Sequence, residues 1–314
     1  MHNIDRAAVA AHDESGFPMD ANRHYLLLVF PVFLLAALCE AAYLRVRRAG
    51  HYDWREVGSS LFIALGQRAI GAASAGLVFG VLVQAWTLRV WTIPMDRSWS
   101  WVLLVLAVEF AYYWQHRCSH EIRWFWATHS VHHSSRTFCL ANADRLGWTG
   151  QVSGNILFLV PLCLLGFPPA YLAGALAVNL FYQFWLHTEI IGRLGWFDRL
   201  LNSPSNHRVH HAVNPGYLDC NYGGILMVYD HIFRSYRSED RGEPCRYGLV
   251  GGKASYNPLR IVFGEWLAAV QDLRGARSLR DAAKFLFAAP GWHPGGAGST
   301  TARLREQARF SRGI

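Results

Sequence analysis

Histidine is concentrated in three short clusters, which constrain the fold more than any other feature of this chain. They read His116-Arg-Cys-Ser-His120, His129-Ser-Val-His132-His133 and His207-Arg-Val-His210-His211, and His187 lies alone between the last two. On a helix, residues at i, i+3 and i+4 share one face, so each cluster can aim its imidazoles at one point. The remaining histidines are scattered, and we expect no ligand role for them: His2, His12, His24, His51, His231 and His293.

The number of clustered histidines indicates more than one metal ion. Imidazole suits zinc, copper, iron and nickel, but a structural zinc takes only four ligands, so nine imidazoles are too many for one ion. Two ions with about four or five imidazoles each leave positions at which oxygen can bind. A single His-x-x-x-His would more often be a surface or core pair. Three clusters in one chain favour a two-metal, histidine-only centre.

The apolar residues are gathered into runs that predict a membrane protein. The chain has 314 residues, of which 52% are hydrophobic, and about 20 apolar residues suffice to cross a bilayer as a helix. The candidate segments are Tyr25–Leu44, Ser59–Val90, Trp99–Trp114, Val152–Gly166 and Ala170–Leu186. Pro168 and Pro169 separate the last two, which predicts a hairpin that turns at these prolines. The alternative is a hairpin buried in a soluble protein.

We therefore predict an all-α fold, an integral membrane helical bundle of about four to five membrane segments with a cytoplasmic helical cap that holds the metal site. The cytoplasmic side follows from Arg45, Arg47, Arg48 and Arg55, which crowd the connection after the first run. Residues 1–24 are polar without a signal-peptide core, and no cleavage is expected. The predicted divisions are 1–24, the membrane helices 25–98, the catalytic domain 99–250 and a basic amphipathic segment 251–314.

The C-terminal segment carries most of the positive charge. Residues 251–314 hold ten Lys and Arg against four Asp and Glu, a net charge of +6. Apolar residues recur in it at helical spacing: Trp266, Leu267, Val270, Leu273, Leu279, Phe285 and Leu286. This pattern predicts an amphipathic helix that either lies on anionic lipid headgroups or packs on the catalytic domain. Nucleic acid is a poor alternative partner, because no nucleic-acid-binding motif accompanies the basic residues.

Cysteine usage is typical of a protein without disulfides. The six cysteines are Cys39, Cys118, Cys139, Cys163, Cys220 and Cys245, and none is spaced as C-x-x-C. We expect free thiols, as is usual on the cytoplasmic side.

Several polar residues are candidates for a place beside the metal site or in a substrate pocket. Glu109 shares a helix face with His116 about two turns away, roughly 10 Å. A carboxyl at that depth needs a partner, and Arg68 is the predicted one, unless the two face different cavities. Gln183 can hold a metal-bound water or pack as a helix amide, and Glu189 can accept a hydrogen bond from a ligating histidine. Further candidates, for which a cap or turn role is equally expected, are Asp144, Asn206, Asp219, Asn221 and Asp230.

The order of these motifs resembles the fatty acid hydroxylase and sterol desaturase superfamily of membrane di-iron oxygenases. The resemblance covers about residues 100–250 and includes Asn221-Tyr222-Gly223-Gly224 after the third cluster. Local phrasing looks closest to the alkylglycerol monooxygenase-like branch. The segments that carry this likeness are Phe125–His129, Val131–Ser135, Gln183–Glu189 and Asn202–His211. The sequence departs from that branch at Asn206, where histidine is usual, and at His231, where arginine is usual.

The resemblance implies a specific cofactor and reaction. Its ligands to two iron ions would be His116, His120, His129, His132, His133, His187, His207, His210 and His211. The implied reaction is hydroxylation of a lipid C–H bond with O2 and an external donor, which is a reduced pterin, a ferredoxin or a cytochrome. A lipid or sterol desaturase with the same centre is the nearest alternative. A histidine-rich metal transporter or a non-catalytic lipid-binding relative fits less well, and zinc can replace iron in purified material.

Overall fold

The computed structural model describes residues 19–47, 52–252, 254–296 and 298–311, with side chains of the first helix described from residue 31 onward. The predicted polar segment 1–24 therefore lies largely outside the described residues. Within these ranges the regular secondary structure is helical, apart from two isolated β-bridges that join Leu201 to Leu226 and Ala212 to Tyr247. The all-α prediction is confirmed for the described residues.

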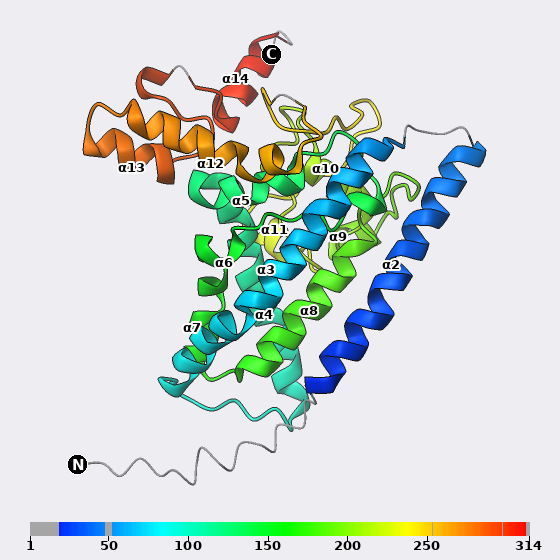
Figure 1. Cartoon of the computed structure of the whole chain (residues 1–314), viewed down its shortest axis with the longest axis vertical. Helices are drawn as coiled ribbons and strands as arrows, with labels where there is room; N and C mark the ends of the chain where they lie inside the picture. Colours follow the sequence, from blue (N-terminus) through cyan, green and yellow to red (C-terminus); the bar gives the residue numbers. More distant parts are fainter. Residues whose placement is uncertain (1–18, 48–51, 253, 297, 312–314) are drawn as a thin grey trace.

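Four long helices run beside one another and form the body of the molecule (Figure 1). They are α2 (Met19–Arg47), α3 (Trp54–Thr87), α4 (Ser98–Glu121) and α8 (Pro169–Phe184). By length and hydropathy, α3 is the one described helix that could cross a membrane. The number of membrane segments remains a prediction.

The core of the body lies between α3, α4, α7 and α8, at the end away from the histidines. Leu82, Leu104, Val108, Leu162 and Leu172 pack together there and are almost fully buried. On the far side of α8, the ring of Phe33 in α2 stacks on Phe184 with 3.7 Å between centroids.

The predicted hairpin is present, but its first arm is not one continuous helix. It is divided into α6 (Gly150–Ser153), η3 (Asn155–Phe158) and α7 (Val160–Leu165). Gly154 interrupts this arm and Gly166 ends it, with φ values of 90° and 108°, a region that favours glycine. A Cβ on Gly166 would also lie 2.3 Å from the carbonyl oxygen of Trp91, so glycine is needed where the hairpin meets the loop after α3.

Short helices at the other end of the bundle carry most of the histidines. They are α5 (Arg123–His133), η2 (Leu140–Asn142), α9 (Phe197–Leu200), α10 (Pro204–His211) and α11 (Val228–Ile232). Glu56, near the start of α3, accepts hydrogen bonds from the backbone nitrogens of Arg136 and Thr137 and so holds the turn after α5 against the long helices.

The C-terminal segment lies across this end of the bundle as α12 (Pro258–Arg274), α13 (Leu279–Phe287), η4 (Pro294–Gly296) and α14 (Thr301–Ser311) (Figure 1). Arg123 of α5 binds both Glu265 and Asp272 of α12, at 3.0 and 2.6 Å. Of the two alternatives for the amphipathic segment, α12 thus shows packing on the rest of the chain, through α5. Leu267 of α12 and Leu279 of α13 are exposed, at 59% and 92%.

Candidate metal centre

The nine clustered histidines come from four places in the fold. His116 and His120 lie in the last turns of α4, the second cluster occupies the end of α5, His187 follows α8, and the third cluster forms most of α10. The start of α10 is well defined, because the Ser203 side chain accepts a hydrogen bond from Asn206 N at 3.3 Å and Pro204 occupies the first turn.

The structure brings all nine imidazoles together in two groups. The five-histidine group contains His116, His120, His129, His133 and His210. The four-histidine group contains His132, His187, His207 and His211. Within each group the ligand atoms lie within 4.8 Å of one another, and the two groups adjoin where the rings of His133 and His211 stack at 4.2 Å. The predicted convergence of the clusters is confirmed.

Three main-chain carbonyl groups orient the rings. The Nδ1 atoms of His116, His210 and His187 lie 2.8, 2.9 and 3.0 Å from the carbonyl oxygens of Tyr222, Cys220 and Gln183. A neutral imidazole that donates from Nδ1 carries its free lone pair on Nε2. The Nε2 lone pairs of these three rings therefore point into the groups, as metal ligation requires.

The nitrogen atoms inside the groups fit bound cations better than hydrogen bonds. His207 Nε2 lies 3.1 Å from Nε2 of both His187 and His211, and one proton cannot bridge both contacts. Among the described residues, the buried Nε2 atoms of His120 and His210 have no hydrogen-bond partner. Buried polar atoms are rarely left unpaired, so these donors fit two transition-metal ions.

Burial also prepares the histidines for ligation. Loss of solvation, followed by the charge of neighbouring histidines, lowers the pKa of His207, His210 and His211 well below the usual 6.5. Burial lowers the pKa of His187 to about 4. At neutral pH these rings are uncharged, so a metal ion does not have to displace a proton.

The predicted pair between Glu109 and Arg68 is wrong. Glu109 is buried and accepts hydrogen bonds from Asn179 Nδ2 at 2.5 Å and from the backbone nitrogens of Ile225 and Leu226 at 2.9 and 2.8 Å. Arg68 instead forms an ion pair with Asp144. The Glu109 carboxyl group does have partners at this depth, but these partners are uncharged amide groups.

Gln183 is a packing amide. Its Nε2 donates to Asn179 Oδ1 at 2.6 Å, and its Oε1 accepts from the Tyr112 hydroxyl at 2.9 Å. The prediction for Glu189 is wrong, because Glu189 accepts a hydrogen bond from Tyr247 at 3.1 Å and none from a histidine.

Of the other candidates, only Asp219 faces a clustered histidine with its side chain, with its Oδ1 3.5 Å from His120 Nδ1. Asp144 pairs with Arg68, as described above. Asn206 donates to the carbonyl oxygen of Asp198 at 2.6 Å. Asp144 and Asn206 therefore have structural roles, which is one of the two alternatives expected for them.

Asp230 and Asn221 shape the loop that carries the carbonyl groups of Cys220 and Tyr222. Asp230 accepts from Tyr222 N and Gly223 N at 2.8 and 2.7 Å. Asn221 has a φ of 58°, and its side chain donates to the carbonyl oxygens of Asn206 and Arg237. The glycines serve close packing, because a Cβ on Gly224 would lie 2.1 Å from Asn179 Nδ2.

Sequence reasoning missed the residues that act through their main chain, Tyr222 and Cys220, because every residue offers a carbonyl. It also missed Phe138, which stacks on His187 with 5.5 Å between centroids. The ring of Tyr247 in turn stacks on Phe138, with 5.0 Å between centroids. No spacing pattern in the sequence marks these two aromatic residues.

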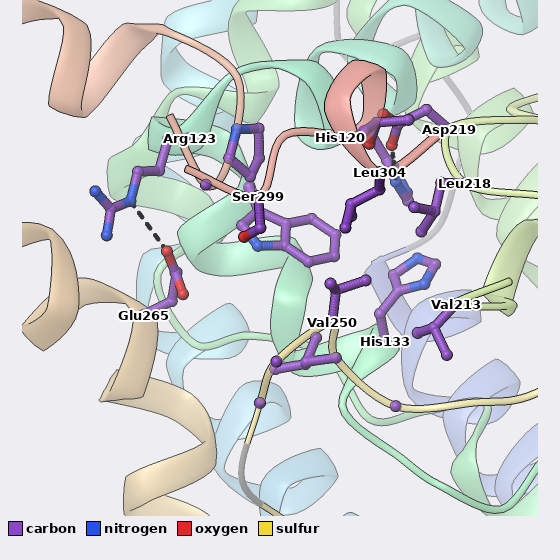
Figure 2. A pocket seen from close by; sticks show the side chains of 18 of the residues that line it. His120, Arg123, His133, Val213, Leu218, Asp219, Val250, Glu265, Ser299 and Leu304 are labelled. Carbon is purple, nitrogen blue, oxygen red and sulfur yellow. Dashed lines mark hydrogen bonds and ion pairs between the residues drawn. The ribbon is translucent and has the colours of Figure 1, made fainter. Parts of the chain in front are cut away.

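Two cavities reach the histidines. One, of about 330 Å³, lies among the long helices and includes His129 and His132, one from each group. None of the described residues that line it is Asp, Glu, Lys or Arg. The other, of about 510 Å³, lies under the C-terminal segment and is polar (Figure 2). It includes His120 and His133, with the Arg123–Glu265 pair on one wall.

Comparison with known proteins assigns part of the chain to a family. Residues 101–235 match the family model described as fatty acid hydroxylase. This part of the chain belongs to the fatty acid hydroxylase family. Alkylglycerol monooxygenase from Homo sapiens is 37% identical over 207 residues, which cover 66% of this chain and 46% of the relative. The enzyme of that name from Xenopus tropicalis is 34% identical, over 76% of this chain and 52% of its own length.

A relative with another name is also similar. Ornithine lipid hydroxylase OlsE from Rhizobium tropici is 27% identical over 51% of this chain and 49% of the relative. The chain thus spans about half the length of these curated relatives. No solved structure matches. The predicted superfamily and its alkylglycerol monooxygenase-like branch are confirmed.

Proposed function

We propose that this protein is a membrane-bound di-iron oxygenase that hydroxylates a C–H bond of a lipid with O2 and an external electron donor. The observation that carries the proposal is the apolar cavity whose wall includes a histidine from each group, His129 and His132. A lipid chain in this cavity lies against both groups at once. Two irons held by the nine histidines would supply reductive activation of oxygen and its insertion into the C–H bond.

The chain's own residues position the substrate and exclude water. Val78, Leu159, Leu176 and Leu180 line the cavity from several sides and suit an alkyl chain. Apolar walls keep water from the reacting bond, which limits side reactions.

The same cavity has a small polar patch that favours an uncharged headgroup. Gln67, Gln115, Gln151 and Asn155 contribute amides from α3, α4, α6 and η3. Oε1 of Gln151 is buried and has no partner among the described residues, so it can accept a hydrogen bond from a substrate hydroxyl. A phosphate or carboxylate would find no cation in the described lining, so we propose a neutral lipid substrate.

The external donor and the membrane occupy other surfaces. We assign the reduced pterin or donor protein to the polar cavity of Figure 2, because it touches histidines of both groups, including His133 and His211. The exposed apolar residues Leu267 and Leu279, close to Arg274 and Arg280, suit anionic headgroups of the inner leaflet. This placement puts the histidines on the cytoplasmic side, in keeping with the arginines after the first run.

The test is comparative lipidomics of cells that carry the wild type, His132→Ala or His231→Ala under ¹⁸O2. His231 is a matched control, because it lies outside both groups and contacts the carbonyl oxygen of Arg199. We expect a lipid that gains one labelled oxygen in the wild type and in His231→Ala, and none in His132→Ala. Identical profiles for all three would refute the proposal, and loss of two hydrogens without label would assign desaturation instead.

A further inference from the structure

One short segment orients most of the five-histidine group. In Leu218–Tyr222, the Asp219 carboxylate faces His120, and the carbonyl oxygens of Cys220 and Tyr222 accept from His210 and His116. In the four-histidine group, by contrast, His187 is oriented by the carbonyl of Gln183, one turn earlier along its own segment. The ring of His187 is therefore oriented without the Leu218–Tyr222 segment.

The backbone of this segment needs support from outside. Asp219 and Asn221 have φ values of 50° and 58°, in the left-handed region that side-chain-bearing residues seldom adopt. The side chain of Asn221 holds one end through Asn206 and Arg237. Because strained conformations persist only where neighbours enforce them, the end that carries Asp219 requires an equivalent constraint.

The C-terminal helix α14 provides that constraint. Nη2 of Arg305 donates to the carbonyl oxygen of Leu218 and lies 3.5 Å from Cys220 Sγ. The side chain of Thr301 forms a hydrogen bond with the Asp219 carboxylate. Figure 2 shows Asp219 directed at His120. Leu218 and, from α14, Leu304 lie close to this pair.

We propose that Thr301 and Arg305 of α14 are positioning residues for the five-histidine metal site, and that they act through the Leu218–Tyr222 segment. The helix lies more than sixty residues beyond the part of the chain that matches the family, residues 101–235. The inference rests on the proposed two-metal function. It makes occupancy of one metal site, and not of the other, dependent on a helix outside the catalytic domain.

The chemical consequence concerns the direction of each ring. Acceptors behind ligating histidines set the tautomer and the ring orientation, and their loss commonly weakens metal binding by about 10- to 100-fold. Without Arg305, the Leu218 carbonyl loses its donor and the turn can relax away from His120 and His210. In the four-histidine group, His187 hydrogen-bonds to the carbonyl oxygen of Gln183, which lies outside the Leu218–Tyr222 segment.

The experiment measures metal and not turnover. The variants Arg305→Ala, Arg305→Lys and Arg309→Ala are purified as full chains, loaded with ferrous iron and diluted into a chelator, and iron release is followed. Arg309 is the matched control, because it lies on the same helix and is exposed. We expect one of the two bound ions to leave Arg305→Ala at least about 10-fold faster, with Arg309→Ala unchanged and Arg305→Lys partly restored.

Several outcomes would overturn the proposal: unchanged release from Arg305→Ala, equal acceleration of both ions, or no recovery with lysine. Thr301→Val, which removes only a hydroxyl, is the second variant if Arg305→Ala does not fold, and it must also accelerate one ion alone. A wild type that binds two ions but oxidises no lipid would refute the proposed function and leave this inference standing. A wild type that binds no metal would refute both.

Discussion

Replacement of Glu109 by alanine tests the account of the buried polar network beneath the histidines. Its carboxylate accepts three hydrogen bonds, from Asn179 Nδ2, Ile225 N and Leu226 N. Alanine leaves these donors unpaired, and a buried unpaired donor costs about 1–3 kcal/mol. Because Ile225 N and Leu226 N are only partly buried, we take the lower half of that range for each of the three donors and expect a loss of about 3–6 kcal/mol.

The assay is thermal unfolding of the metal-loaded protein in detergent, followed by far-UV circular dichroism. At about 2–4 °C per kcal/mol for a chain of this size, Glu109→Ala should lower the apparent Tm by roughly 10 °C. Glu109→Gln keeps an oxygen for the two backbone donors and should lose much less. Glu121→Ala is the matched control on α4, since its exposed pair with Arg117 is worth at most about 1 kcal/mol.

The same assay separates the observed network from an ion pair with Arg68. Arg68 binds Asp144, so the effects of Glu109→Ala and Arg68→Ala should add to within about 0.5 kcal/mol. A larger coupling between positions 109 and 68, or a Tm for Glu109→Ala no lower than that of Glu121→Ala, would refute the reasoning.

Three further predictions concern the site and its supports. Between pH 6.5 and about 4 the unfolded chain binds a proton at His187 that the folded metal-free chain excludes, so chelated protein should lose stability on acidification through that window; a Tm independent of pH would contradict this. Gly224→Ala puts a Cβ 2.1 Å from Asn179 Nδ2 and should lower the Tm by several degrees, whereas Gly174→Ala, with nothing within 4 Å, should leave it unchanged or higher. Glu56→Ala removes the hydrogen-bond acceptor for the turn after α5 and should lower both the Tm and the retention of iron. A variant with the Tm and the iron retention of the wild type would contradict that role.

The convergence of the histidines was predictable, because helical spacing alone decides which residues share a face. The division into groups of five and four was not. His129 and His133 join one group while His132, between them in the sequence, joins the other. Spacing shows which residues share a helix face, whereas the group that each ring joins depends on how α4, α5 and α10 pack together in the tertiary structure.

The hairpin shows a similar limit. Apolar length and the paired prolines predicted two arms and a turn, and α8 does begin at Pro169. The break at Gly154 was not predicted, because an isolated glycine in an apolar run is compatible with a helix until the tertiary contacts are known. Its consequence is functional, since the broken arm supplies Gln151 and Asn155 to the wall of the apolar cavity.

Most hydrogen-bond partners of the histidines are not predictable from the sequence, for a physical reason. Carboxylate and amide side chains are visible in a sequence, and they were the natural candidates for this role. In the structure, the carbonyl oxygens of Tyr222, Cys220 and Gln183 have this role. Of the carboxylate and amide candidates that the structure describes, Asp219 alone faces a clustered histidine with its side chain. A main-chain acceptor is available at every position, so its use is decided by backbone conformation. This conformation is supported by Asn221 and Arg305, which donate to the carbonyl oxygens of Asn206 and Leu218. The orientation of the rings thus rests in part on side chains that a search for histidine partners in the sequence does not single out.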